Sequence, residues 1–207
     1  MEEHENKEMT AQESLSLISE TLNNSRRDIT RRSGKYFLFW GALLTFFSLL
    51  VYLLWTITGN PAWNCLWFAM PAVGIPLERF MRRRKESERV QNDVSRINGG
   101  IWAAFGFFAC AVSAFTLLFY ELNDGIITNL AVAFNLTPEI ALLFGLAECI
   151  SGFTLKNWVI KIAGFVTGIG GLALYYITGA EKEQMFIFAF AGLVLVITGL
   201  IVKHQYK

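Results

Sequence analysis

The stretch that decides the fold is YFLFWGALLTFFSLLVYLLWTIT, residues Tyr36–Thr58, which carries no charged side chain. About 20 consecutive apolar residues in an α-helix span the hydrocarbon core of a bilayer. The composition agrees, because 54% of the 207 residues are hydrophobic and 17% are charged, against about 25% charged in soluble domains. We therefore expect an all-α integral membrane bundle.

Other apolar runs follow along the chain, and we expect six transmembrane helices. Pro71, Gly74 and Pro76 are expected to break the second helix, and the apolar loop Glu121–Thr137 is expected to lie along the outer interface. The chain would then divide into a cytoplasmic N-terminal segment, 1–35, and a six-span membrane domain, 36–207. The expected spans are about 36–58, 61–77, 101–120, 138–155, 158–177 and 185–202.

Orientation follows from the positive charges, because Lys and Arg in short loops stay on the cytoplasmic side. Basic residues gather before the first span and between the second and third spans, whereas the loop Glu121–Thr137 has none. With six spans, every Lys and Arg except Lys182 falls on one side together with both termini. Because the first residues are polar and acidic, we expect no cleavable signal peptide. The expected location is the bacterial inner membrane, with cytoplasmic N- and C-termini.

A short sequence motif, which we call the repeated phrase, occurs before two of the spans: DITRRSG at Asp28–Gly34 and DVSRING at Asp93–Gly99. Each copy follows a polar stretch with a narrow apolar stripe at helical spacing, which predicts a juxtamembrane amphipathic helix. Gly is common directly after a helix ends, so each helix is expected to stop at its Gly. The repeat is either an internal duplication or the effect of a membrane entry that favours Arg, Ser or Asn, and Gly.

These two cytoplasmic helices, one within 1–35 and one at about 79–98, are basic. Thr10 and Glu13 have the spacing of a capping box for the first. Such helices rest on anionic lipid headgroups, and docking of a cytoplasmic protein is the alternative. The expected lipid-surface basic residues are Arg26, Arg27, Arg31, Arg32, Arg82, Arg83, Arg84 and Lys85.

The sequence carries no recognisable catalytic motif. His4 and His204 lie in the tails, and the three cysteines fall singly in different spans. We therefore expect no catalytic residues, no metal site and no cofactor. The near-neutral charge gives no indication of nucleic-acid binding.

Two features inside the spans are candidate sites. Glu148 lies roughly 15 Å down the fourth span, and an intramembrane carboxylate suggests function. It either serves transport, or it is a structural group: protonated and bonded to a neighbouring Ser or backbone group, or paired with Lys161. In the fifth span, small residues recur at a spacing that lets helices approach closely. These helix-packing glycines are Gly164, Gly168 and Gly171.

Two segments carry a family resemblance. ESLSLISETLNNSRRDITRRSGKYFLFWG (13–41) resembles the start of a family of uncharacterised bacterial membrane proteins of similar length, and LFGLAECISGFTLKNWVIKIAGF (143–165) is similar to that family's second marker. Glu148 and the ending ITGLIVKH are departures from the family pattern. The resemblance implies a polytopic inner-membrane protein, often encoded near a small transcription regulator, and implies no activity.

Two function classes follow. The first is a non-catalytic membrane partner that signals or scaffolds through its basic cytoplasmic helices, with a second copy of the chain or a cytoplasmic protein as its partner. The alternative is a small-solute or ion transporter or channel that uses Glu148. The scarcity of polar groups inside the spans favours the first class.

Overall fold

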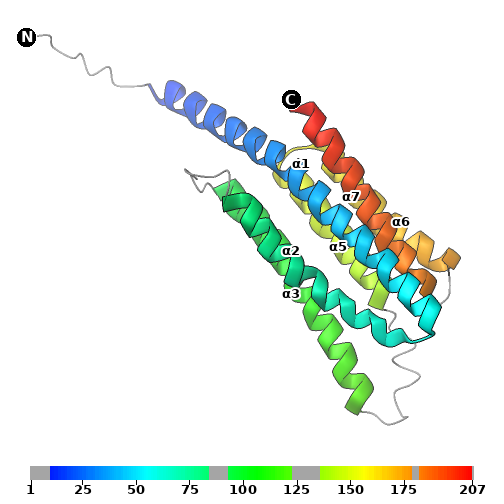
Figure 1. Cartoon of the computed structure of the whole chain (residues 1–207). Coiled ribbons are helices and arrows are strands. Elements are labelled where there is room, and N and C mark those ends of the chain that lie inside the picture. Colours follow the sequence, from blue (N-terminus) through cyan, green and yellow to red (C-terminus); the bar gives the residue numbers. More distant parts are fainter. Residues whose placement is uncertain (1–9, 84–92, 123–135, 179–181, 207) are drawn as a thin grey trace, which may run out of the picture.

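The computed structural model describes residues 10–83, 93–122, 136–178 and 182–206, without the side chains of 82, 83, 93 and 116–122. All elements within these ranges are helical, as the sequence predicted. They are α1 (Ala11–Thr58), the short 3₁₀ helix η1 (Pro61–Cys65), α2 (Leu66–Arg83), α3 (Asp93–Leu122), α5 (Leu136–Thr154), α6 (Trp158–Thr178), the 3₁₀ helix η2 (Lys182–Gln184) and α7 (Met185–Gln205). Figure 1 shows α1, α5, α6 and α7 side by side, with α2 and α3 along one flank.

Among the described residues, five helices are long and apolar enough to cross a membrane: α1, α3, α5, α6 and, together with η2, α7. The sixth long helix, α2, corresponds to the second expected span. The prediction that the second span is broken is wrong, because α2 continues through both Pro71 and Pro76. Gly74 serves another purpose, because a Cβ there would lie 2.6 Å from the ring of Trp40 on α1.

Helix α1 does not stop at Gly34, and α3 does not stop at Gly99, so both predicted helix ends are wrong. Gly34 is needed for a close approach between helices: a Cβ there would lie 3.1 Å from the carbonyl oxygen of Gly199 on α7. The described parts of the expected helix 79–98 also belong to other elements. Residues up to Arg83 extend α2, and Asp93 begins α3.

The most extensive helix contact joins the first and last helices, α1 and α7, which pack antiparallel. A Cβ at Gly41 would lie 2.7 Å from the carbonyl oxygen of Gly192, and one at Gly199 would lie 2.7 Å from that of Gly34. On α1, six of the buried residues repeat at alternating three- and four-residue spacing, which is the pattern of two helices packed along a shared seam. These residues are Gly34, Phe37, Gly41, Leu44, Ser48 and Val51.

The two copies of the repeated phrase occupy different environments. Gly41 and Ser48 of the first copy are buried against neighbouring helices. Gly106 and Ser113, at the same offsets in the second copy, are half-buried, and no described atom lies within 4 Å of a Cβ built at Gly106. The repeated residues therefore have different structural roles.

A second antiparallel pair, α5 and α6, is joined by a short turn. Lys156 in this turn has φ 52°. The buried Asn157 caps α6, because its Oδ1 accepts hydrogen bonds from the backbone N–H groups of Val159 at 2.9 Å and Ile160 at 3.2 Å. Its amide donates to Gln205 Oε1 at 3.3 Å, which ties the turn to the end of α7.

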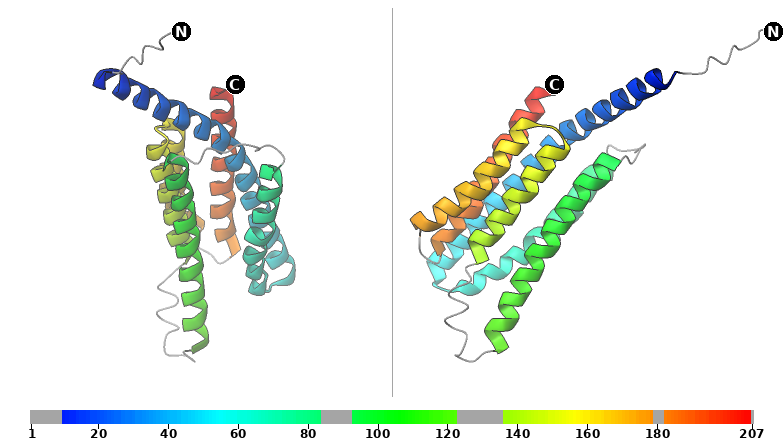
Figure 2. Two further views of the ribbon diagram at one scale, coloured as in Figure 1. Left: turned by 90° about the vertical axis from the view of Figure 1, so that its left-hand side faces the viewer. Right: turned by 180° about the vertical axis from the view of Figure 1, so that it is seen from behind.

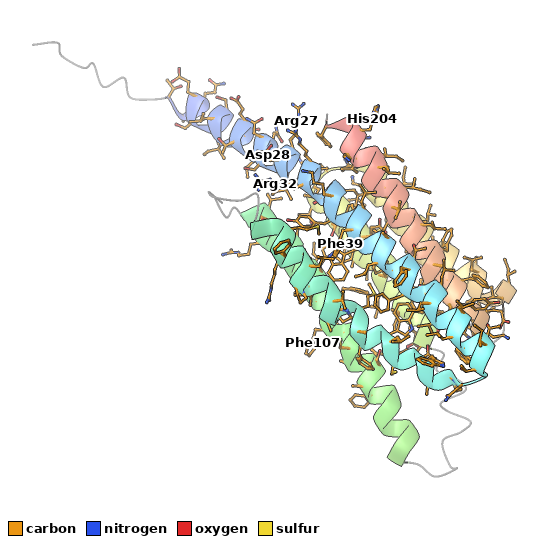
Figure 3. All side chains as sticks on the ribbon, in the orientation of Figure 1. Arg27, Asp28, Arg32, Phe39, Phe107 and His204 are labelled. Atoms are coloured by element: carbon orange, nitrogen blue, oxygen red, sulfur yellow. The ribbon has the colours of Figure 1, made fainter. Side chains whose placement is uncertain are left out.

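Helices α2 and α3 attach at the flank. The indole N–H of Trp40 donates to Glu78 Oε2 at 2.9 Å and so joins α1 to α2. On α3, the Trp102 ring packs against Phe37 of α1 and Phe144 of α5. Other side chains of α3 point outward, such as Phe107, which is 70% exposed (Figure 3).

The N-terminal part of α1 leans across one end of the bundle and continues beyond it (Figure 2). It begins with the expected capping box, in which Thr10 Oγ1 accepts from the Glu13 N–H at 3.3 Å and Glu13 Oε2 accepts from the Thr10 N–H at 2.9 Å. The Glu13 carboxylate accepts this bond from the Thr10 backbone and a second from the Thr10 hydroxyl at 3.0 Å, and the two bonds, in that order, hold the pKa of Glu13 below its usual range. The residues of α1 that are buried begin only at Thr30.

We predict that Gly41→Ala weakens the fold and that its counterpart in the repeat, Gly106→Ala, does not. The new methyl group at position 41 meets the backbone of α7, and overpacking of this kind costs about 1–3 kcal/mol. At position 106 the methyl group has room, and replacing a helical Gly stabilises by roughly 0.5–1 kcal/mol. Thermal unfolding in detergent measures both variants. Equal melting temperatures would contradict the close α1–α7 contact.

Candidate functional site

Glu148 lies on α5 and is completely buried. Its Oε2 accepts a hydrogen bond from the hydroxyl of Thr167 on α6 at 3.1 Å. The position follows from the spacing of small residues along α5, because Gly145 and Gly152 lie on the same side and bring α6 close. Glu148 therefore faces the bundle interior, at the contact between α5 and α6.

Two polar atoms beside this hydrogen bond have no partner among the described residues: Glu148 Oε1 and the hydroxyl oxygen of Ser151. Ser151 is also completely buried and lies three residues beyond Glu148 on the same helix, so both side chains project from neighbouring positions. Buried polar atoms usually have hydrogen-bond partners. Glu148, Ser151 and Thr167 form what we call the internal polar cluster.

Lys161 does not pair with Glu148, so the structure does not bring these two candidate residues together. The ammonium group of Lys161 lies 4.5 Å from the ring centroid of Phe153 and 4.7 Å from that of Trp158. At these distances the cation is attracted by the electron-rich ring faces. Lys161 is therefore placed beside aromatic rings near the α5–α6 turn, away from the internal polar cluster.

The three candidate packing glycines all lie on the buried side of α6. A Cβ at Gly164 would lie 2.7 Å from Cys149 Sγ, and one at Gly171 would lie 3.0 Å from Ala141 Cβ, both on α5. Gly168 is in ordinary contact with Gly145. All three lie in the α5–α6 contact.

The chemistry open to the internal polar cluster is limited. Groups of three or more metal-binding side chains do not occur among the described residues. Cys149 is buried, and its thiol lies 3.5 Å from the carbonyl oxygen of Lys161. An ionised carboxylate is costly in an apolar interior unless it is paired. The arrangement can hold a proton or a small hydrogen-bonding molecule.

The candidate basic residues of α1 lie where this helix passes the end of α7. We call this the basic end of the bundle, since Lys35, Lys156 and Lys203 also lie there. Arg27, Arg31 and Arg32 are exposed and Arg26 is half-buried. Figure 3 shows Arg27 and Asp28 beside the end of α7 that carries His204. Arg82 and Arg83 end α2, and Arg84 and Lys85 lie outside the described residues.

A hollow of about 430 Å³ opens at the basic end. Its lining combines α1 with the last residues of the chain, and sequence reasoning missed this combination. The lining residues are Asn24, Arg27, Asp28, Arg31, Gln205 and Tyr206. Thr167 was missed as well, and Ser151 was anticipated only as an unspecified Ser near Glu148. Their only sequence signal was a hydroxyl within a run of small residues, which is common in membrane helices.

We predict that the interaction of Glu148 with Thr167 contributes to stability and that Glu148 and Lys161 act independently. Glu148→Leu leaves the buried Thr167 hydroxyl without its acceptor, at a cost of about 1–3 kcal/mol, whereas Glu148→Gln retains an acceptor and costs less. A double-mutant cycle of Glu148→Gln with Lys161→Met should be additive within about 0.3–0.5 kcal/mol. Thermal unfolding measures both, and strong coupling to Lys161 would contradict the observed geometry.

In comparisons with protein-family models, curated proteins and solved structures, none matches this chain. The family resemblance of residues 13–41 and 143–165 therefore stays an expectation. The described residues themselves support an all-helical chain with five helices suited to crossing a membrane.

Proposed function

We propose that the chain is a non-catalytic protein of the bacterial inner membrane that docks a cytoplasmic protein on the N-terminal part of α1. The observation that carries the proposal is the apolar stripe on this segment. Leu15, Ile18 and Leu22 are 67%, 56% and 43% exposed. Their three- and four-residue spacing gives one narrow apolar face, which suits the groove of a partner protein.

The length and continuity of α1 support a protein partner over a lipid surface. Residues 11–29 form roughly 28 Å of helix, whereas the headgroup layer on each side of a bilayer is about 5–8 Å thick. A separate helix lying flat on lipid needs a sharp bend before the span, and such kinks arise mainly at Pro, Gly/Ser pairs or local helix bulges. Because α1 is uninterrupted, the stripe is presented on an extension of a bundle helix.

A second copy of the chain is a less suitable occupant of this stripe. Leu15, Ile18 and Leu22 cover about two turns, whereas two copies packed as a coiled coil need an apolar stripe that continues over roughly three to four heptads. The next residues at the same spacing are Ser25 and Ile29, and Ile29 already packs against the bundle core. A preformed groove on another protein can surround these few apolar side chains and bury more of their surface than a second helix would.

Transport through the internal polar cluster is the alternative function, and the unpartnered Oε1 of Glu148 is the observation in its favour. The surrounding geometry gives it less support. Glu148, Ser151 and Thr167 are all completely buried, and α5 and α6 are in backbone contact on both sides through Gly145 and Gly152. A conducting path requires these helices to separate.

Site-specific photo-crosslinking in cells tests the docking function. A photoreactive residue at Ile18 should give one discrete adduct with a cytoplasmic protein, and Leu15→Ser together with Leu22→Ser should abolish this adduct because the apolar contact is lost. Phe107 on α3, which is 70% exposed, is the matched control and should crosslink to lipid. Lipid adducts alone at Ile18 would refute docking, and an adduct of two chains would indicate a homodimer.

The proposed orientation has its own test, cysteine labelling of intact cells with a membrane-impermeant reagent. Asn60 lies between α1 and η1 and is exposed, and Gln205 lies at the basic end. Because positive charges stay inside, Asn60→Cys should be labelled from outside and Gln205→Cys only after the cells are opened. The reverse pattern would place the N-terminal part of α1 outside the cytoplasm and would rule out a cytoplasmic partner.

A further inference from the structure

The hollow at the basic end has the composition of an anion-binding site. Arg27 and Arg31 are one helical turn apart on α1, and both line the hollow together with Asp28. None of these three side chains forms a hydrogen bond or ion pair with another described residue. Two guanidinium groups on one helix face that have no partner among the described residues can together hold an oxyanion such as phosphate.

The opposite wall of the hollow is held in place by the bundle. Gln205 Oε1 accepts a hydrogen bond from the buried Asn157, which leaves the NH₂ group of Gln205 able to donate. Asn157 is itself fixed because its Oδ1 caps α6. Tyr206 packs against the hydrophobic core that includes Leu195 and Val202. The wall therefore offers an amide and a phenol as donors from a rigid support.

Asp28 adds a carboxylate beside the two guanidinium groups. A simple anion gains nothing from this carboxylate, whereas a ligand that has both a phosphate and a hydroxyl or ammonium group can satisfy all three side chains. The position of the hollow along the bundle also favours a lipid ligand. Gln205 and Tyr206 lie two and three residues after Lys203, at the point where the apolar part of α7 ends, and lipid phosphates lie at such boundaries.

We propose that this hollow binds one phosphate-bearing lipid headgroup that also carries a hydrogen-bond donor, with Arg27 and Arg31 on the phosphate and Asp28 on the donor. Phosphatidylglycerol has this chemistry. The site is distinct from the apolar stripe at Leu15–Leu22, and it differs from diffuse lipid attraction because it holds one headgroup in a defined place. Soluble glycerol phosphate shares the chemistry and is the other source of such a group.

The test measures binding to the full-length protein in a neutral detergent, by the rise in melting temperature during titration. Phosphatidylglycerol should stabilise the protein at lower concentration than phosphatidylmethanol, which has the same charge and no headgroup hydroxyl. Arg27→Gln or Arg31→Gln should weaken apparent binding of phosphatidylglycerol by roughly tenfold or more, because a charge-assisted hydrogen bond is lost. Asp28→Ala should remove the preference over phosphatidylmethanol.

Arg79→Gln is the matched control, since it removes the same charge from α2, outside the hollow, and should leave binding unchanged. An equal loss in Arg79→Gln would show general charge attraction and overturn the site. If glycerol phosphate stabilised the protein as strongly as phosphatidylglycerol, the ligand would be a soluble phosphate compound and the lipid proposal would be wrong. No stabilisation by any of these compounds would overturn the proposal, and the melting temperature of each variant without ligand shows whether it is folded.

Discussion

The close approach of α1 and α7 is the contact on which the rest of the structure depends. It joins the two ends of the chain, and it exists because glycine occurs on both helices where their backbones meet. In an apolar solvent, apolar side chains gain little from leaving the lipid, so helix association relies on dense packing. Gly34 and Gly41 on α1, with Gly192 and Gly199 on α7, allow that density. The same contact brings Arg27 and Arg31 beside Gln205 and Tyr206.

The α5–α6 pair is also held by close packing of helix backbones, but this contact encloses a polar group. Glycines on both helices again let the backbones touch, and here a carboxyl group is enclosed in the contact. Thr167 gives Glu148 one hydrogen bond, while Lys161 lies beside aromatic rings. A buried polar group without a full set of partners costs stability.

The basic end combines three elements that are distant in the sequence: the middle of α1, the α5–α6 turn and the end of α7. Asn157 connects the turn to Gln205, and Tyr206 anchors the chain end in the core. Beyond this end, α1 continues as an exposed helix. The bundle therefore presents two surfaces of different chemistry near this end, an apolar stripe on α1 and a polar hollow between α1 and the end of α7.

The sequence by itself determined the helical class, the order of the long apolar helices, the capping box at Thr10 and Glu13, and the position of Glu148 deep in an apolar helix. These properties depend on composition and on local spacing, which a linear pattern records directly. Only the tertiary structure decided the role of Gly34, the partner of Glu148, the position of Lys161 and the residues of the hollow. A glycine that ends a helix and one that admits a neighbouring helix look the same in sequence. The distinction arises only when α7, more than 150 residues further along the chain, packs against α1.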